Sequence, residues 1–208
     1  MQERYISTRD KILARIGQSL PGAIFFAQDF FRDGSDEAVR QQLSRLVKEG
    51  LLIRLSHGTY MSPKRLDGRM IFPQPQEIAD AIARRDKAKL ISTGDGAIAQ
   101  LGLSDQVPSN FVYLTDGPSR SINIQTEEGK GYTIIFKHAA PKNFAFSGKI
   151  SGPIIQALRS IGRENISHEV LKKIHALLIH ENQMDLRNDI GLAPAWIGRL
   201  IVSLLKTE

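Results

Sequence analysis

The stretch between Ser35 and Pro63 limits what this chain can fold into more than any other part of it. It reads SDEAVRQQLSRLVKEGLLIRLSHGTYMSP. Apolar residues recur at helical spacing from residue 39 to residue 47, and a serine suited to capping stands before two acids at the start. After Gly50, apolar and polar residues alternate with the period of a strand, and His57-Gly58 favours a tight turn. We therefore expect a helix over residues 35–49 and a β-hairpin over residues 51–61.

A helix with a polar outer face that leads into a hairpin is typical of the winged helix-turn-helix, in which a recognition helix and a wing contact DNA. The preceding residues supply the rest of such a domain. Ser7 and Asp10 resemble a capping box at the start of a first helix. Residues 24–26 favour a short strand, and residues 27–32 favour a short helix. We assign residues 1–65 to a winged helix-turn-helix DNA-binding domain.

Two groups of residues are predicted to face DNA. Arg40, Gln41 and Ser44 lie in the first half of the recognition helix, from which side chains can reach base edges in the major groove. A second group suits phosphate contacts, which fix register without reading sequence. Its members are Arg45, Lys48, Arg54, His57 and Thr59. The alternative for each residue is an ordinary solvated face, and some winged helices bind only protein.

Charge and composition fit this interpretation. The net charge is +6 with a pI near 9.6, and residues 1–65 hold 11 Lys/Arg against 7 Asp/Glu. Such an excess favours contact with phosphates. The chain has no cysteine, which excludes disulfides and thiolate metal sites and fits a reducing cytoplasm. It shows neither a secretory signal pattern nor the roughly 18 consecutive apolar residues of a membrane helix. We expect a cytoplasmic protein with no membrane partner.

The remainder, residues 70–208, is expected to form a second domain after a loop rich in proline and glycine at residues 63–75. Its first half alternates short strands and helices and includes a hairpin of residues 121–126 and 132–137 around a turn at 127–131. Its second half is helical, beginning at Ser151 as a capping serine. A last helix from Pro194 is apolar over most of its circumference. The whole chain is therefore expected to be α+β, with a small mixed α/β unit and a helical C-terminal region.

The spacing of histidines and acids does not indicate a metal site or a catalytic site. His175 and His180 are five residues apart, which misses the spacing that places two ligands on one helical face. Glu181, Asp185 and Asp189 approach a four-residue spacing but are expected in solvent at a helix end. The glycine-containing turns match neither a phosphate-binding loop nor a dinucleotide fingerprint. We expect no enzymatic activity, no metal and no cofactor.

Three runs in the second domain carry a family resemblance. They are PQEIADAIAR from residue 75, LGLSDQVP from residue 101 and YLTDGPSR from residue 113. Together with the winged helix, they resemble the AbiEi-like antitoxins of type IV toxin–antitoxin and abortive-infection systems, over residues 5–180. The resemblance implies an N-terminal domain that binds inverted repeats at its own promoter and represses the operon. It also implies a C-terminal domain that counters a nucleotidyltransferase toxin encoded beside it, and it leaves direct contact with that toxin open.

The same resemblance favours Asp116, Ser119 and Arg120 as a binding surface toward the DNA backbone or the toxin. From the residues alone, Asp116 is more simply a turn-former whose carboxylate accepts from nearby backbone N–H groups. We thus expect a DNA-binding autorepressor and antitoxin whose partner is its own operator as double-stranded DNA. It would act as a monomer or as a weak dimer pairing on two half-sites. The alternative is a protein-interaction or nucleic-acid-modifying module whose winged helix docks protein.

Overall fold

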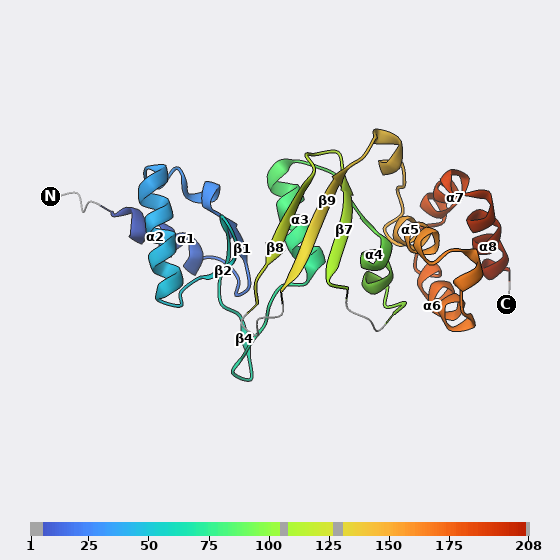
Figure 1. Cartoon of the computed structure of the whole chain (residues 1–208), viewed down its shortest axis with the longest axis horizontal. Coiled ribbons are helices and arrows are strands. Elements are labelled where there is room, and N and C mark those ends of the chain that lie inside the picture. Colours follow the sequence, from blue (N-terminus) through green and yellow to red (C-terminus); the bar gives the residue numbers. More distant parts are fainter. Residues whose placement is uncertain (1–5, 105–107, 127–130, 207–208) are drawn as a thin grey trace. The chain divides into compact units, whose positions relative to one another are not determined.

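The computed structural model describes residues 6–104, 108–126 and 131–206 (Figure 1). It contains both helices and strands, and the predicted α+β class is confirmed. The chain forms two compact units, one of Met1–Gln74 with Asn123–Gly131 and one of Pro75–Ile122 with Tyr132–Glu208. This division differs from the expected one at residues 1–65 and 70–208, because a segment from the middle of the chain belongs to the first unit.

The first unit has the element order and strand pairing of a winged helix-turn-helix. Its elements are α1 (Thr8–Gly17), β1 (Ile24–Phe26), the 3₁₀ helix η1 (Ala27–Phe30), α2 (Asp36–Lys48), β2 (Ile53–Ser56) and β3 (Thr59–Met61). The strands form an antiparallel sheet in the order β1-β3-β2. The helix expected at residues 35–49 is α2, and its N-cap Ser35 accepts a hydrogen bond from the backbone N–H of Ala38. The short helix expected at residues 27–32 is the tighter η1.

One apolar stripe of α2 builds the core of this unit. Val39, Leu43 and Leu46 are fully buried and pack with Ile12 of α1 and Phe30 of η1. Burial of this stripe contributes much of the stability of a helix of this length, because helices of about 13 residues are marginal alone. It also fixes which face of α2 points away from the protein.

A second, smaller hairpin follows the wing, where the sequence predicts a loop at residues 63–75. Strands β4 (Arg65–Leu66) and β5 (Arg69–Met70) pair across Asp67 and Gly68. Both of these turn residues have positive φ, 50° and 77°, as a two-residue type I′ turn requires. Asp-Gly is among the strongest sequence signals for such a turn, so the hairpin was open to prediction from the sequence.

A segment from the middle of the chain completes the first unit beside β2. The backbone N–H of Gln125 donates a hydrogen bond to the carbonyl of Leu55 in β2, at 3.1 Å. β2 pairs with β3 on its other side. A hydrogen bond on the outer side of β2 therefore comes from a segment about 70 residues further along the chain, and no local sequence pattern predicts this contact.

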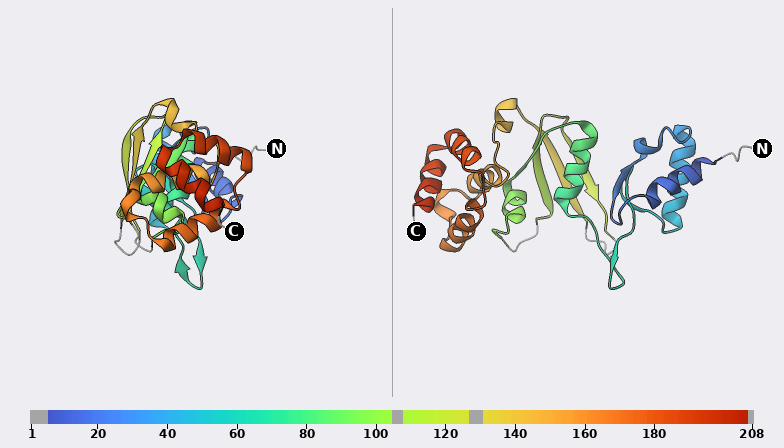
Figure 2. Two further views of the ribbon diagram at one scale, coloured as in Figure 1. Left: turned by 90° about the vertical axis from the view of Figure 1, so that its right-hand side faces the viewer. Right: turned by 180° about the vertical axis from the view of Figure 1, so that it is seen from behind.

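The second unit begins with a four-stranded sheet. Its elements are α3 (Pro75–Asp86), β6 (Leu90–Thr93), α4 (Gly94–Gln100), β7 (Asn110–Thr115), β8 (Arg120–Ile124) and β9 (Tyr132–His138). The strand order is β6-β7-β9-β8, with β6 antiparallel and β9 parallel to β7. Helices α3 and α4 pack on the sheet (Figure 2). The expected hairpin corresponds to the neighbouring strands β8 and β9, and residues 127–130 of its turn lie outside the described residues.

A helical region follows the sheet in the same unit. Its elements are the 3₁₀ helix η2 (Pro141–Phe144), α5 (Ser151–Ile161), the 3₁₀ helix η3 (Arg163–Asn165), α6 (His168–Leu178), α7 (Gln183–Leu192) and α8 (Ala195–Leu205). Side chains from all four α-helices form one core, to which Ile154, Ile174, Leu186 and Ile197 contribute. The last helix buries only part of its surface, since Val202 and Arg199 on α8 are exposed.

The start of α5 corrects two predictions at once. Ile150, not Ser151, is the N-cap residue, and Ser151 is fully buried as the first residue of the helix. Glu181 and Asp189, expected in solvent, are 9% and 0% exposed. Glu181 accepts from the backbone N–H groups of Ile150 and Ser151, both at 2.7 Å. Glu181 therefore binds the first N–H groups at the start of α5. Asp189 of α7 accepts from the N–H groups of Ser147 and Gly148, which precede the helix, and from the hydroxyl of Ser151.

We expect the second unit to lose stability in acid through Glu181. Burial acts to raise the pKa of Glu181, but hydrogen bonds from Ser151, Ile150 and Asn182 outweigh it and hold the pKa below its usual value. A carboxyl with a depressed folded pKa stabilises the protein fully above its unfolded pKa, about 4.3. That stabilisation disappears as pH falls through the folded value. Thermal unfolding followed by circular dichroism from pH 7 to pH 3 should show a drop in Tm below about pH 4.3.

The Glu181→Gln variant provides the control for this acid effect. It lacks the titrating carboxyl, so its Tm should start lower at pH 7 and fall less steeply in acid. Equal slopes for the two proteins would mean that Glu181 does not contribute to the pH dependence.

Candidate nucleic-acid interface

The outer face of α2 carries all the residues predicted there to meet DNA. Exposed on it are Arg40, Gln41, Ser44, Arg45 and Lys48. They project from the helix because the opposite stripe is buried in the core. Arg45 and Lys48 lie in the last turn, where cations interact favourably with the helix macrodipole. The helix therefore presents amide, hydroxyl and guanidinium groups on one face without needing them for its own packing.

Arg40 is held in place by a contact with an aromatic ring. Its guanidinium carbon lies 5.9 Å from the ring centroid of Phe31, which follows η1. A cation over an aromatic face is held weakly, by about 0.5–1 kcal/mol at an exposed site. This contact limits the rotamers of Arg40 while leaving its N–H donors available. A partly oriented guanidinium loses less entropy when it meets a base or a phosphate.

Glu49 is the C-cap residue of α2, and its negative charge would repel a phosphate if no cation were paired with it. The guanidinium of Arg9 in α1 donates to both of its carboxylate oxygens, at 3.0 and 2.6 Å. These hydrogen bonds, opposed by desolvation, hold the pKa of Glu49 below its usual value and raise the pKa of Arg9. The ion pair neutralises the acid and ties α1 to the end of α2. The cations Arg45 and Lys48 are then left as the net charge at this end of the helix.

The predicted hairpin is present as β2 and β3, and the three residues of it that were predicted to contact phosphate differ in exposure. Arg54 and His57 are exposed, in β2 and in the turn. Thr59 is only 3% exposed, so the prediction that it contacts phosphate is wrong. The reason is its place in the sheet, because Thr59 is on the central strand β3 and pairs with Phe26 on one side and Ser56 on the other.

The hairpin of β4 and β5 adds cations that the sequence interpretation missed. Lys64, Arg65 and Arg69 are all exposed on or beside it, in the same unit as α2. Arg65 donates to the carbonyl of Gly68 across the turn, at 3.3 Å. The Asp-Gly pair, with Lys64 and Arg65 before it and Arg69 after it, was the sequence signal for this second hairpin.

The predicted binding surface at Asp116, Ser119 and Arg120 lies at the sheet of the second unit, where each side chain has an internal partner. Asp116 accepts from the backbone N–H of Lys89 at 2.7 Å, and Ser119 accepts from that of His138 at 2.8 Å. Asp116 thus accepts from the residue just before β6. All three residues contribute to the fold, and their role in binding stays a prediction.

Arg120 is the most strongly held of the three. It pairs with Asp86 at the end of α3, and its guanidinium carbon lies 5.1 Å from the ring centroid of Phe136. Burial opposes ionisation of Asp86, but hydrogen bonds from Arg85 and Arg120 prevail and lower its pKa. Arg120 therefore joins α3, β8 and β9 through one side chain.

Two further findings concern membrane-spanning helices and groups of metal ligands. Within the residues that the structure describes, every helix is too short or too polar to span a lipid bilayer. Over the same residues, no group of three or more histidine, aspartate or glutamate side chains is placed to hold a metal ion.

Comparisons with known proteins place the chain in a family. No curated protein matches it. Among solved structures, it is similar to the crystal structure of RV2827C protein from Mycobacterium tuberculosis, with 14% sequence identity and a TM-score of 0.48, over 99% of this chain and 84% of that one. A family model matches residues 11–186, which include parts of both units. The chain therefore belongs to DUF6088, a family of unknown function.

Proposed function

We propose that this protein is a DNA-binding transcriptional autorepressor and antitoxin of a type IV toxin–antitoxin system, acting in the cytoplasm. The observation that carries the DNA-binding part is the exposure of Arg40, Gln41 and Ser44 on the outer face of α2, within a winged helix-turn-helix topology. The antitoxin part is supported by the resemblance of the runs at residues 75, 101 and 113 to AbiEi-like proteins. Its functional partner would be a nucleotidyltransferase toxin.

The proposed mechanism divides the surface of the first unit by role. The first half of α2 enters the major groove, where Arg40 and Gln41 offer the donors and acceptors that read base edges. Arg45 and Lys48 contact phosphates from the second half of the helix, and Arg54 and His57 do so from the wing. Two protomers on an inverted repeat would place two α2 helices on half-sites about one or more helical turns apart. Binding in this way would occlude the promoter.

The test is footprinting and gel-shift titration on the gene's own promoter at two salt concentrations. The wild-type protein should protect an inverted repeat, with an affinity that falls steeply as salt rises. Arg40→Ala should weaken specific binding by roughly 1–3 kcal/mol, because a lost base contact affects the operator more than other DNA. Arg45→Ala should weaken binding to all sequences alike and reduce the salt slope by about 1.

A matched control separates these contacts from net charge. Arg187→Ala removes one exposed arginine from α7 in the second unit, and it should leave operator binding and the salt slope unchanged. If neither Arg40→Ala nor Arg45→Ala altered operator binding, the assignment of α2 as a recognition helix would be wrong. If a selection from random oligonucleotides retained no DNA, the alternative of a protein-docking winged helix would be favoured.

A further inference from the structure

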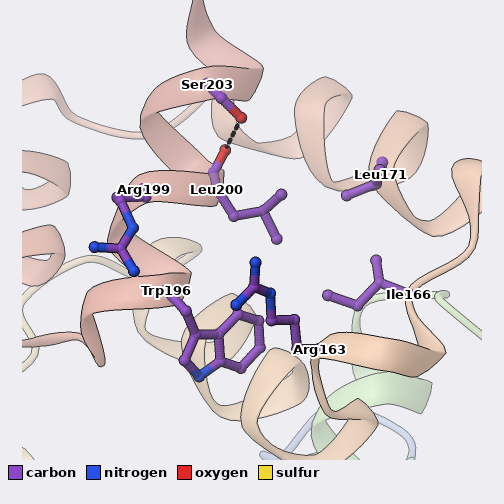
Figure 3. A pocket seen from close by; sticks show the side chains of 7 residues that line it. All are labelled: Arg163, Ile166, Leu171, Trp196, Arg199, Leu200 and Ser203. Atoms are coloured by element: carbon purple, nitrogen blue, oxygen red, sulfur yellow. Dashed lines mark hydrogen bonds between the residues drawn. The ribbon is translucent and has the colours of Figure 1, made fainter.

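A pocket of about 440 Å³ lies in the helical region of the second unit, and none of its lining residues belongs to the proposed DNA interface. Its walls come from η3, the start of α6 and one side of α8 (Figure 3). Its apolar lining consists of Ile166, Leu171 and Leu200, with the indole of Trp196. This volume lies within the range of about 300–1,000 Å³ that is usual for small-molecule sites.

Two guanidinium groups belong to the same pocket. Arg199 is one turn beyond Trp196 on α8, and Arg163 extends from η3 into the space between Trp196, Leu200 and Ile166, as Figure 3 shows. No carboxylate is among the lining residues. Neither arginine forms an ion pair or a hydrogen bond with another residue in the described ranges. The pocket therefore carries two positive charges that the fold does not neutralise.

Trp196 is the single tryptophan of the chain, and it is only partly buried. Part of its indole packs against the helical core, and the rest lines the pocket. Leaving part of the indole at the wall of a charged pocket provides a flat aromatic surface. Flat rings stack on such a surface with a favourable free energy of about 1–3 kcal/mol for a nucleobase.

We propose that this pocket binds a nucleotide, with the base against Trp196 and the phosphate held by Arg163 and Arg199. A terminal phosphate carries a charge of about −1.5 to −2 and three acceptor oxygens, which match two guanidinium groups. A carboxylate carries only one charge and two oxygens, so one arginine would satisfy it. The nucleotide is the ligand class that joins such a phosphate to a flat ring. Two sources are compatible with this chemistry, a free mononucleotide and the phosphorylated end of a nucleic-acid strand.

The fluorescence of Trp196 provides a direct measurement, because no other tryptophan contributes to the signal. The full-length protein is titrated with AMP, GMP, CMP and UMP, with adenosine, with inorganic phosphate, and with a 5′-phosphorylated trinucleotide. At least one mononucleotide should quench the emission saturably, and adenosine and inorganic phosphate should each bind more weakly. Tighter binding of the trinucleotide would identify a strand end as the source, and tighter binding of a mononucleotide would identify the free ligand.

Charge-removing variants assign the phosphate contact. Arg163→Gln and Arg199→Gln should each weaken nucleotide binding by roughly tenfold to a hundredfold, as expected for loss of a charged hydrogen bond. Arg187→Gln, on α7 and outside the pocket, is the matched control and should bind as the wild type does. Titration calorimetry on Trp196→Leu tests the base contact without the fluorophore, and weaker nucleotide binding is expected. Thermal unfolding of each variant checks that the fold is retained.

Three results would overturn the proposal. They are the absence of binding to any mononucleotide at millimolar concentration, equal affinity for inorganic phosphate and for the nucleotides, and equal weakening by Arg187→Gln and the two pocket variants. Operator binding by the first unit does not depend on any of these outcomes. A negative result here would therefore leave the proposed DNA binding unaffected.

Discussion

Replacement of Asp189 by asparagine is expected to lower the free energy of unfolding of the second unit by about 2–4 kcal/mol. Asp189 is 0% exposed, and its carboxylate accepts from the N–H of Ser147 at 2.8 Å, the N–H of Gly148 at 3.0 Å and the hydroxyl of Ser151 at 2.6 Å. An asparagine keeps one acceptor oxygen and turns an NH₂ group toward donors. At least one of these N–H groups then loses its partner inside the loop that precedes α5. Urea unfolding followed by Trp196 fluorescence measures the effect in this unit.

Asp185→Asn provides the comparison on the same helix. It makes the same chemical change in the first turn of α7, where no donor among the described residues is bound to the carboxylate. Loss of its interaction with the macrodipole would cost less than about 1 kcal/mol. Equal destabilisation by the two variants would show that Asp189 acts only through its charge. Such a result would contradict the hydrogen-bonded role described for it.

Leu43→Ala is expected to destabilise the first unit by about 2–5 kcal/mol, through lost burial and the cavity that remains. Leu43 is fully buried in the middle of α2, among Val39, Leu46 and Phe30. The helix that carries the predicted DNA contacts would then open more often, so operator binding should weaken even though no DNA-facing residue has changed. Hydrogen exchange of the α2 amides, read by mass spectrometry, measures the loss directly.

The adjacent residue is the matched control. Ser44 is exposed on the opposite face of α2, and Ser44→Ala should change stability by less than about 0.5 kcal/mol. Faster exchange in Ser44→Ala than in Leu43→Ala would mean that the helix faces the other way. The two variants together therefore test the orientation of the helix separately from its affinity for DNA.

Elements with a strong local period could be predicted from the sequence. The stripe of Val39, Leu43 and Leu46 identified α2 and its buried face, and the Gly50 stop and the following alternation identified the wing. The β4–β5 hairpin carries the equally local Asp-Gly signal. The burial of Thr59 could be predicted only from the strand order, because alternation along a strand does not show whether that strand is central or at an edge.

Interactions between residues far apart in the sequence have no local sequence pattern that predicts them. Ser151 before a glycine and a proline has the local pattern of a cap, but the groups that bind the start of α5 come from Glu181 and Asp189, 30 and 38 positions away. The pocket joins Arg163 to Trp196, which are 33 positions apart on η3 and α8. Local spacing identifies residues on one element, whereas these sites depend on how separate elements pack.

The return of Gln125 to the edge of β2 means that the first unit is not a detachable module. A fragment that stops at residue 74 would leave the outer side of β2 without its neighbour, and a bare strand edge is a template for association with other chains. Fusions or truncations that contain residues 1–74 without the rest of the chain would therefore lose solubility. The polypeptide passes between its two units three times, so exchange of one unit between homologues requires three coordinated junctions and not one.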